Sequence, residues 1–266
     1  MLTRRQLFRD ALLAAGAALG GPLLGKALAM GQASRLRLAT LRYGGNWNTR
    51  TGALQRVLEQ VDLRTSVLVT FDAGAAAADQ TTIFQFPLLW MSGDLDVQPF
   101  SEQAVENLQR HMGFGGTLFA DDTSGRADSA FAQSLRGELE RVFPGRKLEP
   151  LPADHAVFRS YYYLARVAGR SRVSPRLEGI TVDDRTVAIF SANDLSGVLE
   201  NLRPEAEFGL GGIQSEEEVL AVRQAVNIVM YALTVNYKLD QVHVSYQLSH
   251  PESYPRLRRR PDEPQR

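Results

Sequence analysis

Cysteine is absent from this chain of 266 residues, and lysine is scarce, with three lysines against 27 arginines. Without cysteine there can be no disulfide, thiolate nucleophile, zinc–thiolate site, iron–sulfur cluster or lipidated cysteine. No apolar run reaches the roughly 18 residues that a membrane span needs. The remaining composition, 44% hydrophobic and 23% charged, is that of a globular protein, which excludes general disorder and low-complexity structure.

An excess of charge is also absent, because 30 basic residues balance 30 acidic ones. Residues 1–29 hold four basic residues and one acidic residue, which leaves 26 against 29, a net charge of −3, in residues 30–266. Residues 256–266 carry a local charge of +3, so the body before them is acidic at −6. A mildly acidic body argues against a nucleic-acid partner.

The N-terminal segment has the three parts of an export signal. Arg4 and Arg5 form a twin-arginine pattern, a short apolar run broken by glycines follows, and Ala27-Leu28-Ala29 supplies small residues before a cleavage site. We expect the twin-arginine translocase to deliver the protein to the periplasm, with cleavage after Ala29. A general secretory signal with two chance arginines and a retained membrane anchor are the alternatives.

Strand and helix patterns alternate after this signal. The sequence predicts strands at 36–43, 66–71, 86–91, 117–120, 147–151, 179–182 and 186–191, the last two forming a hairpin. It predicts helices around 54–61, from Ser101 to Met112, from Asp128 to Val142 and from Ser215 to about Tyr237, with residues 72–79 as an alanine-rich loop.

Strands separated by helices form βαβ units and a mostly parallel sheet. We therefore expect residues 1–29 to be a signal peptide and residues 30–250 to form a single three-layer α/β domain with a doubly wound sheet. That sheet should centre on 86–91 and 117–120, the least polar strands, with Trp90 buried. The tail 251–266, rich in proline and arginine, is expected to be disordered.

The turn after the first strand is one candidate ligand site. Tyr43 precedes Gly44-Gly45-Asn46-Trp47, and such a turn before a helix can present backbone N–H groups to an anion. The motif is not G-x-G-x-x-G or a P-loop, so it does not indicate a nucleotide. The alternative, which we favour, is a tight turn with Trp47 packed over the sheet edge.

Acidic residues at predicted strand ends form the second candidate site. Asp121 and Asp122 end one strand, and Asn193-Asp194 follow another. Ligands of open α/β sheets lie beyond the carboxyl ends of the strands, so these groups are expected in one crevice. Asp121, Asp122 and Asp194 are candidate ligands of a divalent cation, or else they serve as helix caps and turn formers.

His155 is the histidine considered for this site, as a base or as an outer hydrogen-bond partner of the carboxylates. The chain has no H-E-x-x-H or similar histidine spacing for zinc. Ser92 follows the central strand but lacks the G-x-S-x-G frame of a nucleophile elbow. No nucleophile–base pair and no cofactor are indicated.

Several stretches together resemble the family called domain of unknown function 4159. They are Leu41-Arg42-Tyr43-Gly44-Gly45-Asn46-Trp47, Phe86-Pro87-Leu88-Leu89-Trp90-Met91-Ser92-Gly93, Phe100-Ser101, Gly115-Gly116-Thr117-Leu118-Phe119-Ala120-Asp121-Asp122, 134–143, 151–158 and 189–195, within residues 36–237. The resemblance implies a class I glutamine amidotransferase-like, flavodoxin-type fold. Members are often bacterial envelope proteins encoded near MoxR-type ATPases and von Willebrand A-domain proteins, and no activity is established for them. Members often have Gly-His-Gly after the central strand, where this chain has Gly93-Asp94-Leu95.

Two classes of function fit these observations. The first is a non-catalytic ligand-binding or assembly module of the envelope, with von Willebrand A-domain or MoxR-associated proteins as partners. The second is a hydrolase that uses carboxylates or a divalent metal. Amidotransferase chemistry is excluded because it needs a cysteine nucleophile. We favour the first class because no nucleophile–base pair is visible in the sequence.

Overall fold

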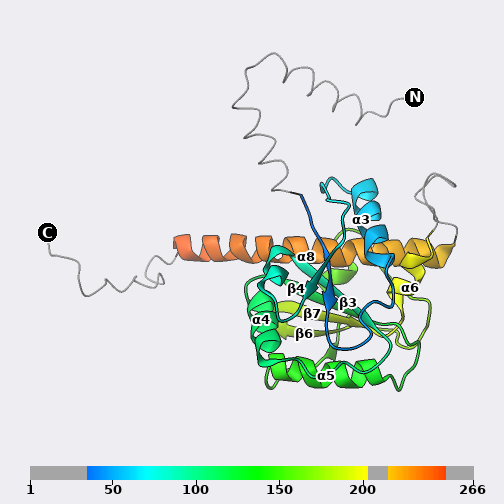
Figure 1. Ribbon diagram of the computed structural model, residues 1–266. Helices are drawn as coiled ribbons and strands as arrows, with labels where there is room; N and C mark the ends of the chain where they lie inside the picture. The colour runs from blue at the N-terminus through cyan, green and yellow to red at the C-terminus, as the bar shows by residue number, and fades with distance from the viewer. Residues whose placement is uncertain (1–34, 203–214, 250–266) are drawn as a thin grey trace, which may run out of the picture.

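A computed structural model describes residues 35–202 and 215–249 of the chain, with side chains described up to residue 234 (Figure 1). The predicted signal peptide, its cleavage site after Ala29 and the tail from Pro251 lie outside the described residues. In the part of the chain that the structure describes, no helix combines the length and the apolar character required to cross a membrane.

Seven strands form one sheet in the order β2-β1-β3-β4-β7-β6-β5. The strands are β1 (Ala39–Arg42), β2 (Gly74–Ala77), β3 (Leu88–Gly93), β4 (Thr117–Asp122), β5 (Glu149–Pro150), β6 (Glu178–Val182) and β7 (Arg185–Ser191). The first five in the sheet order are parallel, and β6 and β5 extend the sheet as antiparallel strands. The parallel part is doubly wound and its strand order reverses between β1 and β3, which confirms the predicted α/β class.

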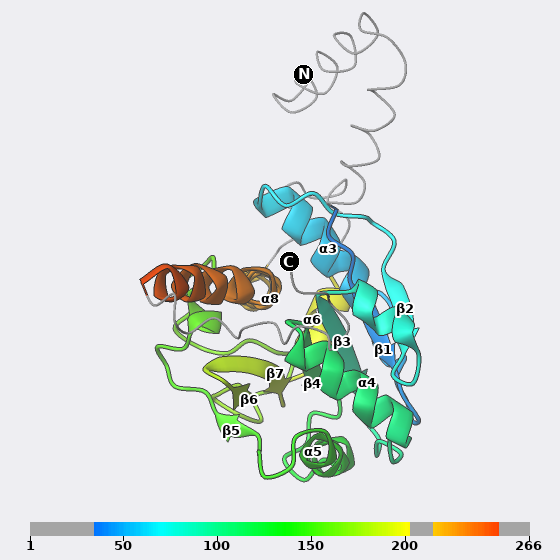
Figure 2. The ribbon, with the colours of Figure 1, turned by 90° about the vertical axis from the view of Figure 1, so that its left-hand side faces the viewer.

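Helices cover both faces of the sheet (Figure 2). The helices on one face are α3 (Ala53–Arg64), α6 (Leu195–Glu200) and α8 (Glu216–Ser249), and those on the other are α4 (Glu102–Gly113) and α5 (Ala130–Val142). Leu88 and Trp90 of β3 point into the first core, whereas Leu89 and Met91 point into the second. A strand buried on both faces has no polar side to alternate with, which is why β3 is a continuous apolar run.

The position of the central strands is confirmed. β3 lies between β1 and β4, and β4 lies between β3 and β7, so both are inside the sheet. Trp90 is 2% exposed and packs against Phe119 with ring centroids 4.4 Å apart. Its indole Nε1 donates to Ser196 Oγ at 3.0 Å, which satisfies the one polar atom that the burial of tryptophan removes from water.

Serine side chains begin three of the helices. Ser101 caps α4 and Ser129 caps α5, each accepting a hydrogen bond from a backbone N–H three residues on. Ser215 and Glu218 form the predicted capping box before α8. The predicted cap at Asp128 is wrong by one residue, because its carboxylate pairs with Arg126 and leaves the cap to Ser129.

The second strand is not where the sequence predicted it. In residues 66–71 only Val69 forms a bridge, to Leu36, whereas β2 lies at Gly74–Ala77, within the predicted alanine-rich loop. Small side chains suit this edge because the Phe86 ring packs over it: a Cβ on Gly74 would lie 3.1 Å from that ring. Tertiary packing therefore selects a segment of low strand propensity.

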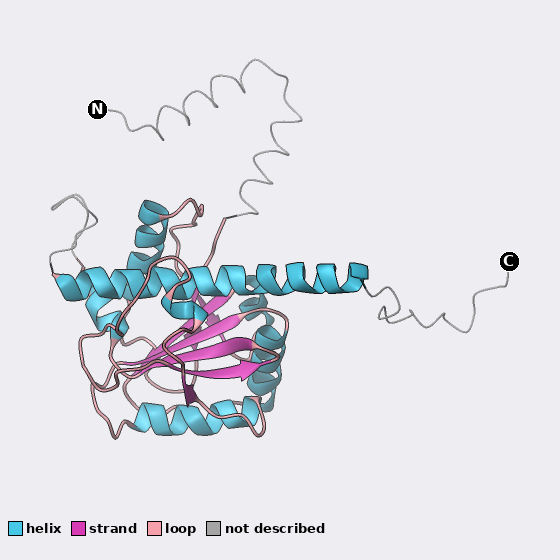
Figure 3. Ribbon diagram, turned by 180° about the vertical axis from the view of Figure 1, so that it is seen from behind, coloured by secondary structure: helices cyan, strands magenta, loops and turns pink. Residues whose placement is uncertain are grey.

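The last helix is longer than predicted. α8 runs from Glu216 to Ser249, past the expected end near Tyr237, and its second half continues beyond the sheet (Figure 3). Its first half holds the loop that contains the short helix η2 (Ala156–Phe158). Asn227 makes four hydrogen bonds to backbone groups of this loop, two as acceptor and two as donor, so the loop is tied to the α8 face.

Candidate functional site

The carboxyl ends of β1 and β3 meet where the strand order of the sheet reverses. Tyr43 Oη lies 3.0 Å from the backbone O of Ser92 and 3.1 Å from that of Asn46. Asn46 Nδ2 donates to Asp94 Oδ1 at 2.8 Å. Burial, helped by the charge of Asp94, raises the pKa of Tyr43, so this hydroxyl stays protonated and acts as a donor.

Close packing explains the glycines of this junction. A Cβ on Gly93 would lie 2.1 Å from Tyr43 Oη and 2.6 Å from the Phe131 ring. Gly45 has a φ of +139°, a value that side chains rarely permit. Trp47 is partly buried and packs against the core beneath α4 and α5. The Tyr43–Trp47 turn and the β3 end are thus bound to each other.

Asp194 is the most heavily bonded of the predicted acidic residues. It is fully buried at the N-terminus of α6, where its Oδ1 accepts from the Gly197 N–H at 2.9 Å. The Arg50 guanidinium donates to both of its oxygens, at 3.0 and 2.7 Å, and Arg170 Nε lies 2.7 Å from Oδ2. Four donors therefore surround one carboxylate, and the hydrogen bonds that Arg50 donates to Asp194 raise the pKa of the Arg50 guanidinium.

Asp121 lies beside this group and is also fully buried. Its two oxygens accept from the backbone N–H groups of Leu195, at 3.1 Å, and Ser196, at 2.7 Å. Burial is the main reason that the pKa of Asp121 is raised to about 7, since it disfavours the charged form. The amide and hydroxyl of Ser196 and the amide of Leu195 oppose the rise in the pKa of Asp121, and the negative Asp194 adds to it.

Asp122 and Asn193 complete the cluster from the same sheet edge. Asp122 Oδ1 accepts from the Ser124 N–H at 2.9 Å in a local turn, and its buried Oδ2 has no hydrogen-bond partner. Asn193 holds the neighbouring loop, because its side-chain amide accepts from Ser174 N and donates to Ser174 O. Within residues 35–202 and 215–234, no group of three or more histidine, aspartate or glutamate side chains is arranged to hold a metal ion.

His155 is not brought to this cluster. Its Nε2 lies 3.0 Å from Thr186 Oγ1 near the amino end of β7, whereas Asp121 pairs with Ser191 at the carboxyl end of that strand. Five residues of strand separate the two positions, about 16 Å. The expectation that His155 would serve these carboxylates is therefore wrong, because its loop packs near the other end of β7.

The histidine has a defined proton position. Its Nδ1 accepts from the Val157 N–H at 3.2 Å, and burial lowers its pKa, which favours the neutral ring. The proton then sits on Nε2, so His155 donates to Thr186 Oγ1. To activate the Thr186 hydroxyl as a base, His155 would have to accept its proton at Nε2. In this tautomer Nε2 already carries a proton, so it cannot do so.

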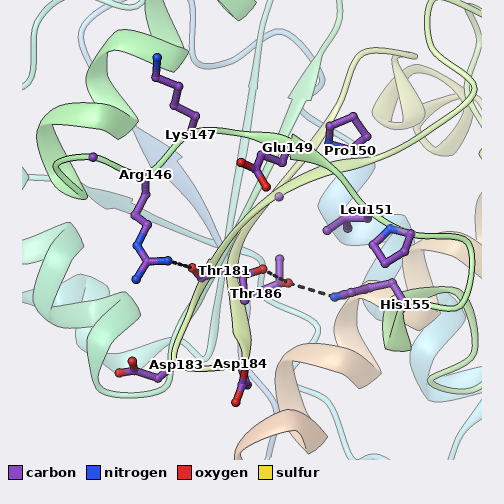
Figure 4. A pocket seen from close by; sticks show the side chains of 13 residues that line it. Arg146, Lys147, Glu149, Pro150, Leu151, His155, Thr181, Asp183, Asp184 and Thr186 are labelled. Atoms are coloured by element: carbon purple, nitrogen blue, oxygen red, sulfur yellow. Dashed lines mark hydrogen bonds between the residues drawn. The ribbon is translucent and has the colours of Figure 1, made fainter.

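A cavity of about 760 Å³ lies next to His155, between the end of α5 and the antiparallel strands (Figure 4). His155, Thr186 and Thr181 form a chain of hydrogen bonds along one wall, with the two threonine hydroxyls 3.0 Å apart. The residues that line it are Gly145, Arg146, Lys147, Glu149, Pro150, Leu151, Pro152, His155, Gly179, Thr181, Asp183, Asp184 and Thr186.

Sequence analysis missed the arginines of the sheet-edge cluster. Arg50 lies 144 positions before Asp194, so no local pattern joins them. Arg170 lies in the run Gly169-Arg170-Ser171-Arg172, and the two arginines in this short run were the sequence feature that could have indicated a partner for the carboxylates. The cavity was missed for a different reason, since its lining comes from three segments that are each ordinary turns or strand ends.

A comparison with known protein families covers most of the residues that the structure describes. No curated protein compared with the chain matches it. A family model described as Domain of unknown function (DUF4159) matches residues 37–233, in agreement with the resemblance over 36–237. Because this match covers well over half of the 266 residues, the chain belongs to that family.

Proposed function

We propose that this chain is an exported protein of the bacterial envelope whose body, on an amidotransferase-like fold, is a non-catalytic binding or assembly module. The observation that carries the proposal is the state of the acidic residues at the carboxyl edge of the sheet. Asp194 is held by Arg50 and Arg170, and Asp121 by two backbone amides. Both carboxylates are fully buried, and their hydrogen bonds position α6 and the loop at Arg170 rather than present an acid or a base to a substrate.

The second support is the tautomer of His155. A hydroxyl–imidazole pair such as Thr186 and His155 resembles half of a catalytic triad. The Val157 N–H at Nδ1 places the proton on Nε2, and Thr186 is only 1% exposed. The pair therefore works as a structural link between β7 and η2. Together with the absence of cysteine, this favours binding over the hydrolase alternative.

Partners follow from the family resemblance. Relatives are encoded beside von Willebrand A-domain and MoxR-type proteins, so we propose one of those envelope proteins as the partner. Export through the twin-arginine route, signalled by Arg4 and Arg5, would deliver the folded module to it.

The test is a binding titration with protein purified from the periplasm. The immobilised full chain is titrated with a von Willebrand A-domain protein of the kind encoded near its relatives, and we expect saturable binding. The same preparation is assayed with chromogenic ester, amide, phosphoester and glycoside substrates, with and without Mg²⁺ or Mn²⁺. Turnover that Asp121→Asn or His155→Ala abolishes would contradict the proposal, and so would a failure to bind any protein encoded in the neighbourhood.

A further inference from the structure

The turn between β6 and β7 leaves an open stretch of sheet edge at Thr181. Asp183 and Asp184 have φ values of +48° and +62°, as in a type I′ hairpin turn. Val182 and Arg185 then form the hydrogen-bonded pair that closes the hairpin, so Thr181 and Thr186 form a non-hydrogen-bonded pair. The backbone N–H and C=O of Thr181 therefore point away from β7, toward the outside of the sheet.

The edge strand β5 stops before it reaches this stretch. Glu149 pairs with Gly179 and Pro150 with Glu178, and no further residues of β5 pair with β6. The chain before Glu149 turns away toward α5, with Gly145 at a φ of +76°. In place of a strand, Arg146 Nη1 donates to the Thr181 carbonyl at 3.4 Å, a weak contact at the limit of hydrogen-bond distance.

Charges of opposite sign flank this open edge inside the cavity (Figure 4). Arg146 and Lys147 lie where the chain leaves α5, and Asp183 and Asp184 form the turn at the end of β6. All four side chains are exposed. Thr181 and Asp183 are two residues apart, about 7 Å along a strand. A chain laid along the edge would meet the Arg146 guanidinium near Thr181 and carboxylates one strand period further on, whereas the Lys147 side chain points away from the edge (Figure 4).

We propose that this edge binds an extended peptide segment of another protein, in which an acidic and a basic side chain stand two residues apart. The segment adds to β6 as a strand, and its N–H replaces the Arg146 guanidinium at the Thr181 carbonyl. Its acidic side chain pairs with Arg146, and its basic side chain pairs with Asp183 and Asp184. Main-chain pairing supplies affinity and the paired charges supply specificity. This inference rests on the proposed binding function and names the chemistry of the partner.

Two short peptides test the inference directly. The labelled, capped pentapeptides Thr-Glu-Val-Lys-Thr and Thr-Lys-Val-Glu-Thr cover both strand directions, and binding to the full chain is followed by fluorescence anisotropy. We expect one of them to bind saturably. N-methylation of its residues one at a time should weaken binding roughly five- to tenfold at one position only, because the carbonyl of Thr181 is the one acceptor that this open stretch of β6 offers to a peptide N–H.

Charge variants locate the site. Asp183→Asn with Asp184→Asn should weaken binding roughly fivefold through the loss of two exposed ion pairs. Asparagine tolerates the positive φ of both positions, so the turn is kept. The matched control is Asp72→Asn with Asp79→Asn, which removes the same charge from exposed residues beside β2 at the opposite edge and should leave binding unchanged.

Four results would overturn the inference. If neither peptide binds, or if the Asp183/Asp184 variant binds as well as the wild type, the peptide site at this edge is excluded. The proposed binding function is tested separately, by the titration with the partner protein. Weakening at every N-methylated position would exclude strand addition. A dimer of the wild type that the same variant dissociates, measured by light scattering, would assign the edge to a second copy of this chain.

Discussion

Asp194 has four hydrogen-bond donors, whereas Asp121 has two and one oxygen of Asp122 has none. Asp194→Asn would remove the charge that holds two arginines and leave the guanidinium of Arg50, whose side chain is 18% exposed, without its main partner. We expect a loss of about 2–4 kcal/mol in the free energy of unfolding. Urea unfolding followed by circular dichroism measures it.

The matched control is Arg170→Ala, because the Arg170 side chain is 54% exposed and Asp194 keeps Arg50 when it is removed. Its loss should stay below about 1 kcal/mol. If Asp194→Asn is as stable as the wild type, the arginine contacts do not compensate the buried carboxylate, and the site must be reinterpreted.

Asp121 gives stability a specific pH dependence. Its pKa is raised to about 7 in the folded protein, above the ordinary value of 3.8, so the folded state binds a proton more tightly than the unfolded state. The stabilisation from that proton is complete below pH 3.8 and is lost as the pH rises through 7. Asp121→Asn lacks this dependence.

The stability of the wild type relative to Asp121→Asn should therefore fall between pH 5 and pH 8. Thermal melts of both proteins across this range give the difference directly, and the other titrating groups cancel in the comparison. A wild type that gains stability relative to the variant as the pH rises would show that the two amide donors outweigh burial and keep Asp121 ionised.

Sequence reasoning found the residues of the sheet edge but not their partners. Asp121, Asp122 and Asp194 could be placed because the carboxyl ends of parallel strands share one edge. Their partner Arg50 could not, since a contact across 144 positions leaves no local pattern. His155 was expected at this cluster, but its loop packs near Thr186 at the amino end of β7, and no local pattern in the sequence indicates at which end of the sheet the loop lies.

Individual elements were predictable where local chemistry and packing agree. The apolar run of β3 and the Ser215–Glu218 capping box are examples, since each pattern has one stable interpretation. β2 was not, because glycine and alanine have weak strand propensity and the Phe86 ring decides their position. The cap of α5 was displaced from Asp128 to Ser129 by the Arg126 ion pair, which a propensity rule does not contain.

Trp90 tests the packing of β3 between the two helical layers. Trp90→Ala should lower the free energy of unfolding by about 3–5 kcal/mol, because it opens a cavity against Phe119 and leaves Ser196 Oγ without its donor. Trp90→Phe, which keeps most of the packing, should lose less. Guanidinium unfolding compares the three proteins, and a loss below about 1 kcal/mol for Trp90→Ala would place the residue outside the tight core.

At the scale of the whole molecule, the sheet order determines where the polar residues gather. Reversal between β1 and β3 opens the carboxyl edge there, and Tyr43, Asn46 and Asp94 fill that junction with hydrogen bonds to each other or to the backbone. The large cavity lies elsewhere, beside the antiparallel extension. The doubly wound sheet could be predicted from alternating strands and helices, but the exposed hairpin edge depended on where β5 stops.

We expect delivery of the whole protein to the periplasm to depend on its twin arginines. Arg4→Lys with Arg5→Lys keeps both charges but removes the paired guanidinium groups that the twin-arginine translocase recognises, so the double variant should stay in the cytoplasm. Cell fractionation and immunoblotting report the location. Normal periplasmic delivery of the variant would indicate the general secretory route.

As the central claim we propose that Asp194, held by arginines, and Asp121, held by backbone amides, are structural groups and that their cluster is not a metal-dependent catalytic site. The most direct measurement is the thermal melting of wild type and Asp122→Asn, each with and without millimolar Ca²⁺, Mg²⁺ or Mn²⁺. The account predicts that none of these ions changes the melting temperature of either protein. An ion-dependent rise in the wild type that Asp122→Asn abolishes would contradict it and restore the metal-dependent hydrolase.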